Sequence, residues 1–92
     1  MSNLGTFIVT AHWQSLEEIL GATPTGVYTI QNKGNYSIIL SEMAAEPEES
    51  DHSGVSLYPH EKTVYDASGD PLWLRIEKFG LVGVEINVEG SG

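Results

Sequence analysis

The residue types most often used for catalysis and metal binding are few in this chain, and their spacing suits neither purpose. The histidines are His12, His52 and His60, and no two of them form the HxH, HxxxH or HExxH spacing that brings two imidazoles to one metal ion. His60 is followed directly by Glu61, and adjacent residues of a strand point to opposite faces. We therefore expect no metal site and no cofactor. We expect His12 to pack near Trp13 in a structural role, and the other two histidines to lie in exposed loops.

One group of oxygen ligands resembles the start of a calcium loop. Asp66, Ser68 and Asp70 lie at positions i, i+2 and i+4, but a full loop has glycine after the third ligand and a later glutamate. Here Gly69 precedes the third ligand and Pro71 follows it. A turn in which aspartate and serine accept local backbone hydrogen bonds is therefore the favoured interpretation. The acidic segment 46–51 stays a weaker candidate for calcium.

Enzyme motifs are incomplete or missing. Ser56 lies within Gly54–Tyr58, which lacks the second glycine of a nucleophile elbow, and no phosphate-binding or dinucleotide-binding glycine pattern occurs. A carboxylate pair for glycoside cleavage stays open, but 92 residues leave little room for a cleft beside a core. We predict that the protein is not an enzyme, with a small hydrolase as the weakest alternative.

Length and charge limit the domain count and the partners. We expect a single β domain over residues 1–92, with no disulfide because there is no cysteine. Thirteen acidic and four basic residues give a net charge of −9, which repels nucleic acid phosphates and anionic membranes. No run approaches the ~18 apolar residues of a membrane-spanning helix, and we do not expect the first residues to act as a signal peptide, since they contain no charged leader and no apolar segment. We expect a soluble domain without nucleic acid or membrane partners; the charge suits a basic partner or simply keeps the chain soluble.

Short alternating runs separated by turn residues predict an all-β fold. Turns recur every 8–12 residues, and no long helical pattern separates the runs, so a small antiparallel sandwich or barrel is favoured. The seven predicted strands are Thr6–Ala11, Val27–Gln31, Tyr36–Ser41, Val55–Tyr58, Lys62–Asp66, Leu72–Glu77 and Val82–Glu89.

One short helix is expected near residues 15–20. Ser15 and Glu18 have the spacing of a capping box, and Gly21 is placed to end the helix. A helix this short is not stable alone, so we expect it to cover one end of the sheet with Trp13 beside it.

The connections also carry predictions. Residues 32–35 form a turn in which Gly34 suits a positive φ, and the strands on either side are expected to pair as a hairpin. The carboxylate-rich segment 42–53 is expected to be a solvated loop. Residues 1–5 and 90–92 are expected to be flexible ends, and whether residues 1–12 pair within the chain or with a neighbour stays open.

The aromatic residues are either core packing or part of a binding face. Tyr58 and Trp73 are the best candidates for outward-facing aromatics, because each lies opposite the apolar face of its strand. Together with the first strand they give a set of candidate interface residues: Phe7, Val9, Trp13, Tyr58, Trp73 and Arg75.

Three segments carry a family resemblance. They are Tyr28-Thr29-Ile30-Gln31-Asn32, Gly54-Val55-Ser56-Leu57-Tyr58-Pro59-His60-Glu61 and Leu72-Trp73-Leu74-Arg75. With the segment Trp13–Gly21 before them, this series resembles small β-rich virion proteins of tailed bacteriophages, over residues 13 to 77. The motifs are turn and core positions, and no catalytic residues come with them.

The resemblance implies a repeated, non-enzymatic component of the virus particle, made in the host cytoplasm. A capsid decoration protein is the leading expectation: it would bind the major capsid protein or another virion protein as a homo-oligomer, with a trimer as the guess. The alternative is a head-fibre, collar or tail-associated module that recognises a glycan or a host receptor.

Overall fold

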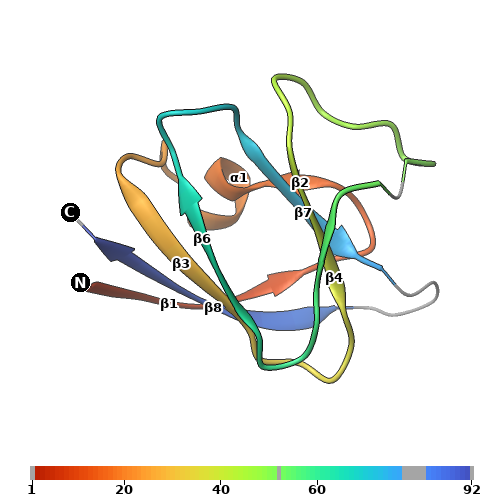
Figure 1. Ribbon diagram of the computed structural model, residues 1–92, viewed down its shortest axis with the longest axis horizontal. Coiled ribbons are helices and arrows are strands. Elements are labelled where there is room, and N and C mark those ends of the chain that lie inside the picture. Colours follow the sequence, from red (N-terminus) through yellow and green to blue (C-terminus); the bar gives the residue numbers. More distant parts are fainter. Residues whose placement is uncertain (1, 52, 78–82, 92) are drawn as a thin grey trace.

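The computed structural model describes residues 2–51, 53–77 and 83–91 and is a β-sandwich of two four-stranded antiparallel sheets (Figure 1). The strands of the first sheet are, in spatial order, β1 (Ser2–Val9), β8 (Val84–Ser91), β3 (Val27–Asn32) and β6 (Lys62–Asp66). Those of the second sheet are β2 (Gln14–Ser15), β7 (Leu72–Ile76), β4 (Ile38–Glu42) and β5 (Val55–Leu57). The prediction of a small all-β sandwich is therefore confirmed.

The core lies between the sheets and follows the period of two in the sequence. Alternate residues of each strand point inward, so the predicted inner faces of β7 and β8 are buried. Val82, predicted to belong to the last strand, lies outside the described residues. The main core cluster consists of Val9, Leu16, Tyr28, Ile30, Ile38, Leu40, Leu57, Tyr65, Leu72, Leu74, Ile76, Val84, Ile86 and Val88.

The predicted helix is α1 (Leu16–Leu20), and the residues that flank it in the sequence cap both of its ends. Ser15 Oγ accepts from Glu18 N at 3.1 Å, and the Glu18 carboxylate accepts from Ser15 N at 3.4 Å. Gly21, at φ 76°, donates to Glu17 O at 2.8 Å. The first residue of α1, Leu16, is buried in the core, so α1 covers one end of the sandwich as expected. No helix in the described part of the chain is long and apolar enough to cross a membrane.

The predicted hairpin between the second and third strands is wrong. β3 pairs with β6 and β8 in the first sheet, whereas β4 pairs with β5 and β7 in the second. The reason is the fully buried side chain of Asn32. Its Nδ2 donates to Tyr36 O at 2.8 Å and Leu57 O at 3.0 Å, and its Oδ1 accepts from Gly34 N at 2.9 Å. These bonds make the segment between β3 and β4 a corner that passes from one sheet to the other.

Gly34 is required in this corner for a reason other than the one predicted. Its φ is not positive. A Cβ at this position would lie 2.6 Å from Val84 Cγ1, so the absence of a side chain lets the corner approach β8. Lys33 N also donates to Glu85 O at 2.8 Å, which fixes the same approach.

The two ends of the chain pair with each other. β1 begins at Ser2 and β8 reaches Ser91, with Ser2 opposite Gly90 and Asn3 opposite Glu89. Residues 2–5 and 90–91 are thus strand rather than the loose ends expected, and the first strand pairs within the chain. That strand also ends at Val9, two residues earlier than predicted.

Replacement of Asn32 by alanine tests the corner. Asn32→Ala removes the hydrogen bonds to two carbonyls and one amide, of which the bond to Leu57 O is buried and the other two are partly buried. We therefore expect the free energy of unfolding to fall by about 2–4 kcal/mol. Urea unfolding measures the change. Asn35→Ala, at an exposed position of the same corner, is the control and should change stability by less than about 0.5 kcal/mol. Equal effects from the two variants would contradict this role of Asn32.

Candidate functional site

The six candidate interface residues are not equally accessible. Val9, Trp13 and Arg75 are buried, Phe7 and Trp73 are half-buried, and Tyr58 is 58% exposed. The first three therefore offer no side-chain surface to a partner in this structure. Val9 belongs to the core between the sheets, whereas Trp13 and Arg75 lie elsewhere and have a different function.

Trp13 and Arg75 hold a loop against the outer face of the second sheet. The Trp13 indole Nε1 donates to Glu48 O at 3.1 Å and to Asp51 O at 3.0 Å. The Arg75 guanidinium donates to Glu49 O at 2.6 Å, and its Cζ lies 5.6 Å from the centroid of the Trp13 ring. Arg75 points outward from its strand as predicted, but it is only 7% exposed because the loop covers it.

The acidic segment is consequently an anchored loop and not a freely solvated one. Pro47 is buried, and so is Ile39, which lies directly opposite Arg75 in the pairing of β4 with β7. The side chains of Glu46, Glu48 and Glu49 remain exposed. The backbone of the loop thus satisfies the buried cation, while three of its side chains present negative charge to solvent. Pro47, an apolar residue inside the acidic run, is the sequence signal that could have indicated this.

The structure agrees with only some of the predictions for the histidines and for the Asp66–Asp70 turn. His12 is exposed, contrary to the expected packing, and its Nδ1 bonds the Glu49 carboxylate. His60 is exposed as predicted, and His52 lies outside the described residues.

The segment Asp66–Asp70 forms the predicted turn. Asp66 Oδ1 accepts from Ser68 N at 2.9 Å. Hydrogen bonds from the Ser68 backbone and, second in size, from the Ser68 side chain lower the pKa of Asp66. Among the described residues no three His, Cys, Asp or Glu side chains are grouped to hold a metal ion.

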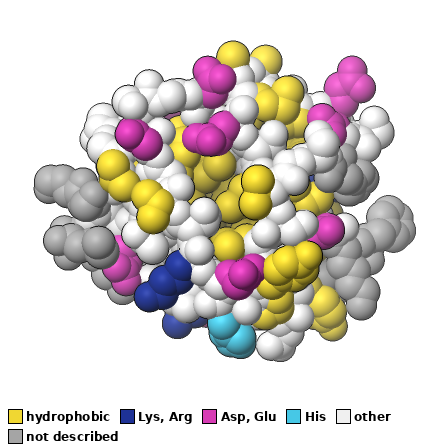
Figure 2. Space-filling view, in the orientation of Figure 1, with side chains coloured by type: hydrophobic (Ala, Val, Ile, Leu, Met, Phe, Trp, Pro, Cys, Tyr) yellow, Lys and Arg dark blue, Asp and Glu magenta, His cyan; other side chains and the backbone are white. Residues whose placement is uncertain are grey.

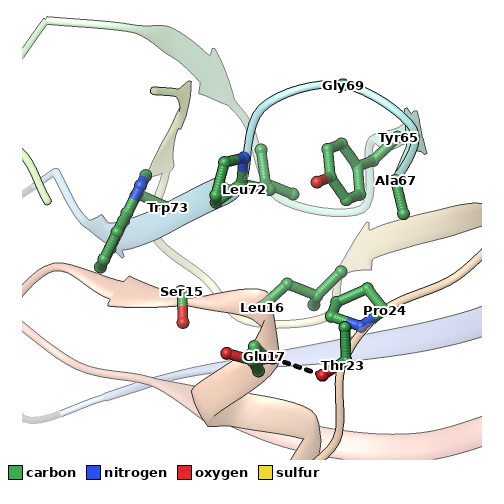
Figure 3. A pocket seen from close by; sticks show the side chains of 11 residues that line it. Ser15, Leu16, Glu17, Thr23, Pro24, Tyr65, Ala67, Gly69, Leu72 and Trp73 are labelled. Carbon is green, nitrogen blue, oxygen red and sulfur yellow. Dashed lines mark hydrogen bonds between the residues drawn. The ribbon is translucent and has the colours of Figure 1, made fainter. Parts of the chain in front are cut away.

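A pocket of about 240 Å³ lies at the end of the sandwich beside α1 (Figure 3). Residues 15–17 and 23–24 line one side of it, and residues 65–73 line the other. Most of its walls are apolar; the main contributors are Leu16, Pro24, Tyr65, Leu72 and Trp73.

The rim of this pocket is polar. The Glu17 carboxylate accepts from Thr23 Oγ1 at 2.7 Å (Figure 3). Because Glu17 is exposed, its negative charge lies on the solvent side of the lining. The indole Nε1 of Trp73 donates to Met43 O at 3.0 Å, and this bond fixes the ring in the wall. Sequence reasoning selected Trp73 but missed Glu17, because the two come together only when α1 packs against β7.

A second, shallower depression surrounds the exposed Tyr58. It is lined by Tyr36, Tyr58 and Pro59 together with three polar residues, Asn35, Ser37 and Glu77. Tyr58 begins the turn to β6, in which its backbone N–H donates to the Glu61 carboxylate at 2.7 Å and its carbonyl accepts from Glu61 N at 3.0 Å.

The comparisons with known proteins find no relative of this chain. No family model, no curated protein and no solved structure matches it.

Replacement of Trp13 by phenylalanine tests the anchoring of the acidic loop. Trp13→Phe keeps an aromatic ring but removes the two hydrogen bonds to the loop, so the free energy of unfolding should fall by about 1–3 kcal/mol. A glutamate-specific protease should also cleave after Glu48 and Glu49 faster than in the wild type. Tyr58→Phe is the control and should leave cleavage unchanged. Unchanged cleavage in Trp13→Phe would show that the indole does not hold the loop.

Replacement of Tyr65 by phenylalanine tests the alkaline stability of the pocket wall. Burial, and next the negative charge of Glu42, raise the pKa of Tyr65 above its ordinary value, and its hydroxyl donates to Asp70 O at 2.8 Å. The unfolded chain therefore loses this proton first, so the stability contributed by Tyr65 is complete below pH ~10 and is lost as the pH rises through the higher pKa of the folded state.

Urea unfolding at a series of pH values from 8 to 11 checks this expectation. Wild-type stability should decline more steeply above pH ~10 than that of Tyr65→Phe, which should be less stable at pH 8 by about 1 kcal/mol for the lost hydrogen bond. Parallel curves for the two proteins would contradict the assignment.

Proposed function

We propose that this protein is a non-enzymatic structural protein of a tailed-bacteriophage virion that decorates the capsid by binding a basic surface of the shell. The resemblance in sequence motivates the choice of virion. The pocket beside α1 supports the mode of attachment, since it combines apolar walls with a carboxylate on the solvent side of its lining.

The dimensions of this pocket favour a protein side chain as its occupant. Its volume of about 240 Å³ is below the roughly 300–1,000 Å³ typical of small-molecule sites. A lysine or arginine side chain fits such a place well, because its aliphatic stem packs on apolar walls while its charged head stays at the rim. Here the stem would lie along Leu16 and the Trp73 ring, and the head would meet the Glu17 carboxylate.

The charge of the whole molecule supports a basic partner. The net charge is −9, and the loop fixed by Trp13 and Arg75 holds the exposed carboxylates of Glu46, Glu48 and Glu49 on an ordered backbone. Complementary charge speeds encounter with a partner, and an ordered loop costs less entropy on binding than a free one.

Neutralising Glu17 tests the proposal. Glu17→Gln keeps an acceptor for Thr23 and removes only the charge, so the affinity for capsids that lack the protein should fall about fivefold to twentyfold at low salt. Co-sedimentation with such capsids measures the affinity, and mass spectrometry of virions counts the copies. Glu85→Gln, which removes a charge from an exposed position on β8, is the matched control and should bind as the wild type does.

The number of copies per virion distinguishes a shell component from a collar or tail component. Hundreds of copies per virion fit a shell component, whereas about a dozen or fewer fit a collar or tail position set by lower symmetry. Absence from virions together with no binding to capsids would refute the proposal.

A second candidate rests on the depression around Tyr58. Exposed tyrosine rings beside asparagine, serine and glutamate provide a stacking face and hydrogen-bonding groups, which suits a glycan or a receptor bound by a head-fibre, collar or tail module. Loss of glycan binding in Tyr58→Ala, with Glu17→Gln unaffected, would favour this function over capsid decoration.

A further inference from the structure

The first sheet has two edge strands, β1 and β6. β6 pairs with β3 on one side, and among residues 2–51, 53–77 and 83–91 no strand pairs with its other side. Its central residue, Val64, is 68% exposed. A free edge strand with an exposed apolar residue offers unpaired backbone groups to another strand, and this makes β6 a candidate for pairing between molecules.

Two hydrogen bonds determine which backbone groups of β6 are unpaired. Ala67 N donates to Gly26 O at 2.8 Å at one end of the ladder, and Asn32 N donates to Glu61 O at 3.0 Å at the other. In an antiparallel pair the bonded positions alternate, so the odd-numbered residues of this strand bond to β3. The N–H and C=O groups of the even-numbered residues therefore point away from β3. One of them, the Asp66 carbonyl, accepts from Gly69 N at 3.4 Å in the turn that follows.

The even-numbered residues form a self-complementary sequence. They are Lys62, Val64 and Asp66, and all three side chains are exposed on the outer face of the sheet. If two copies of β6 align antiparallel about Val64, Lys62 of each copy lies opposite Asp66 of the other, and the two valines face each other. Within residues 2–51, 53–77 and 83–91, neither Lys62 nor Asp66 takes part in an ion pair.

We propose that two copies of this chain associate through β6 in this register, which joins their first sheets into one continuous eight-stranded sheet. The outward N–H and C=O groups of Lys62 and Val64 and the N–H of Asp66 then bond to the second copy. The Asp66 carbonyl already accepts from Gly69 N, and its second lone pair accepts from the second copy. The two Lys–Asp pairs select this register, because a shift by two residues places charge opposite valine. This association is independent of the function proposed above.

The surroundings of β6 also favour a second copy of the chain as its partner. Figure 2 shows hydrophobic side chains in the middle of the face turned to the viewer, with acidic side chains around them. Next to β6 lies a hollow of about 130 Å³, lined mainly by Leu40, Val55, Tyr65 and Leu72, where Val55 is also 68% exposed. A second β6 at this edge shields Val55 and Val64 from water, which adds an apolar contribution to the backbone hydrogen bonds.

Charge reversal at β6 tests the proposal by sedimentation velocity. Two five-residue strands bury little area, so the wild type should be dimeric at ~1 mM and should dissociate on dilution to ~10 µM. Lys62→Asp and Asp66→Lys each place like charges opposite each other, and each should weaken self-association by about tenfold or more. A 1:1 mixture of the two variants restores both opposite-charge pairs and should dimerise at least as well as the wild type.

A charge reversal elsewhere in the first sheet serves as the control. Glu85→Lys, a charge reversal on β8 in the same sheet, should leave the dimer unchanged, and urea unfolding checks that each variant folds. A wild type that is monomeric at ~1 mM would overturn the proposal, as would variants that dimerise alone as tightly as the wild type. Failure of the mixture to associate would overturn the proposed register.

Discussion

The fold depends on one buried amide side chain. Asn32 bonds three backbone groups, and in this way it turns the chain from the first sheet into the second. One of its partners, Leu57 O, lies twenty-five residues away, at the end of β5. The corner therefore connects the end of β3 with the end of β5, and both sheets are positioned by the same side chain. Such a group is costly to bury unless every bond is made, so the arrangement is strongly specified.

The sequence predicts the strands and their inner faces well, because the alternation of apolar residues directly reports which side chains are buried. Val84, Ile86 and Val88 are one example, and the capping box of α1 is another. The same alternation does not show to which of the two sheets a strand belongs. β3 and β4 are two strand-like runs joined by a short turn sequence, as in a hairpin, and nothing local to residues 32–35 reveals that Asn32 bonds to a distant carbonyl.

The candidate site was only partly predictable for the same reason. Exposure of Tyr58 is predicted because it lies opposite the apolar face of its strand, and the prediction agrees with the structure. Arg75 is on the outer face of its strand, so alternation predicts exposure, and Trp13 lies just before β2, where no alternation applies. They are buried because the acidic loop supplies carbonyl acceptors for them, a contact between residues more than twenty positions apart. A negatively charged loop thereby covers the chain's single arginine, and the two features support each other.

The pairing of β1 with β8 has a geometric consequence for the protein as a building block. Ser2 lies opposite Gly90, so the start of β1 and the end of β8 lie side by side at one end of the first sheet, as Figure 1 shows, while β6 is an edge strand of that sheet. A polypeptide joined to either end would leave the molecule in the direction of the strands, beyond the end of this sheet. The backbone edge of β6 runs along the strand direction, so such a fusion extends past this edge and does not lie across it.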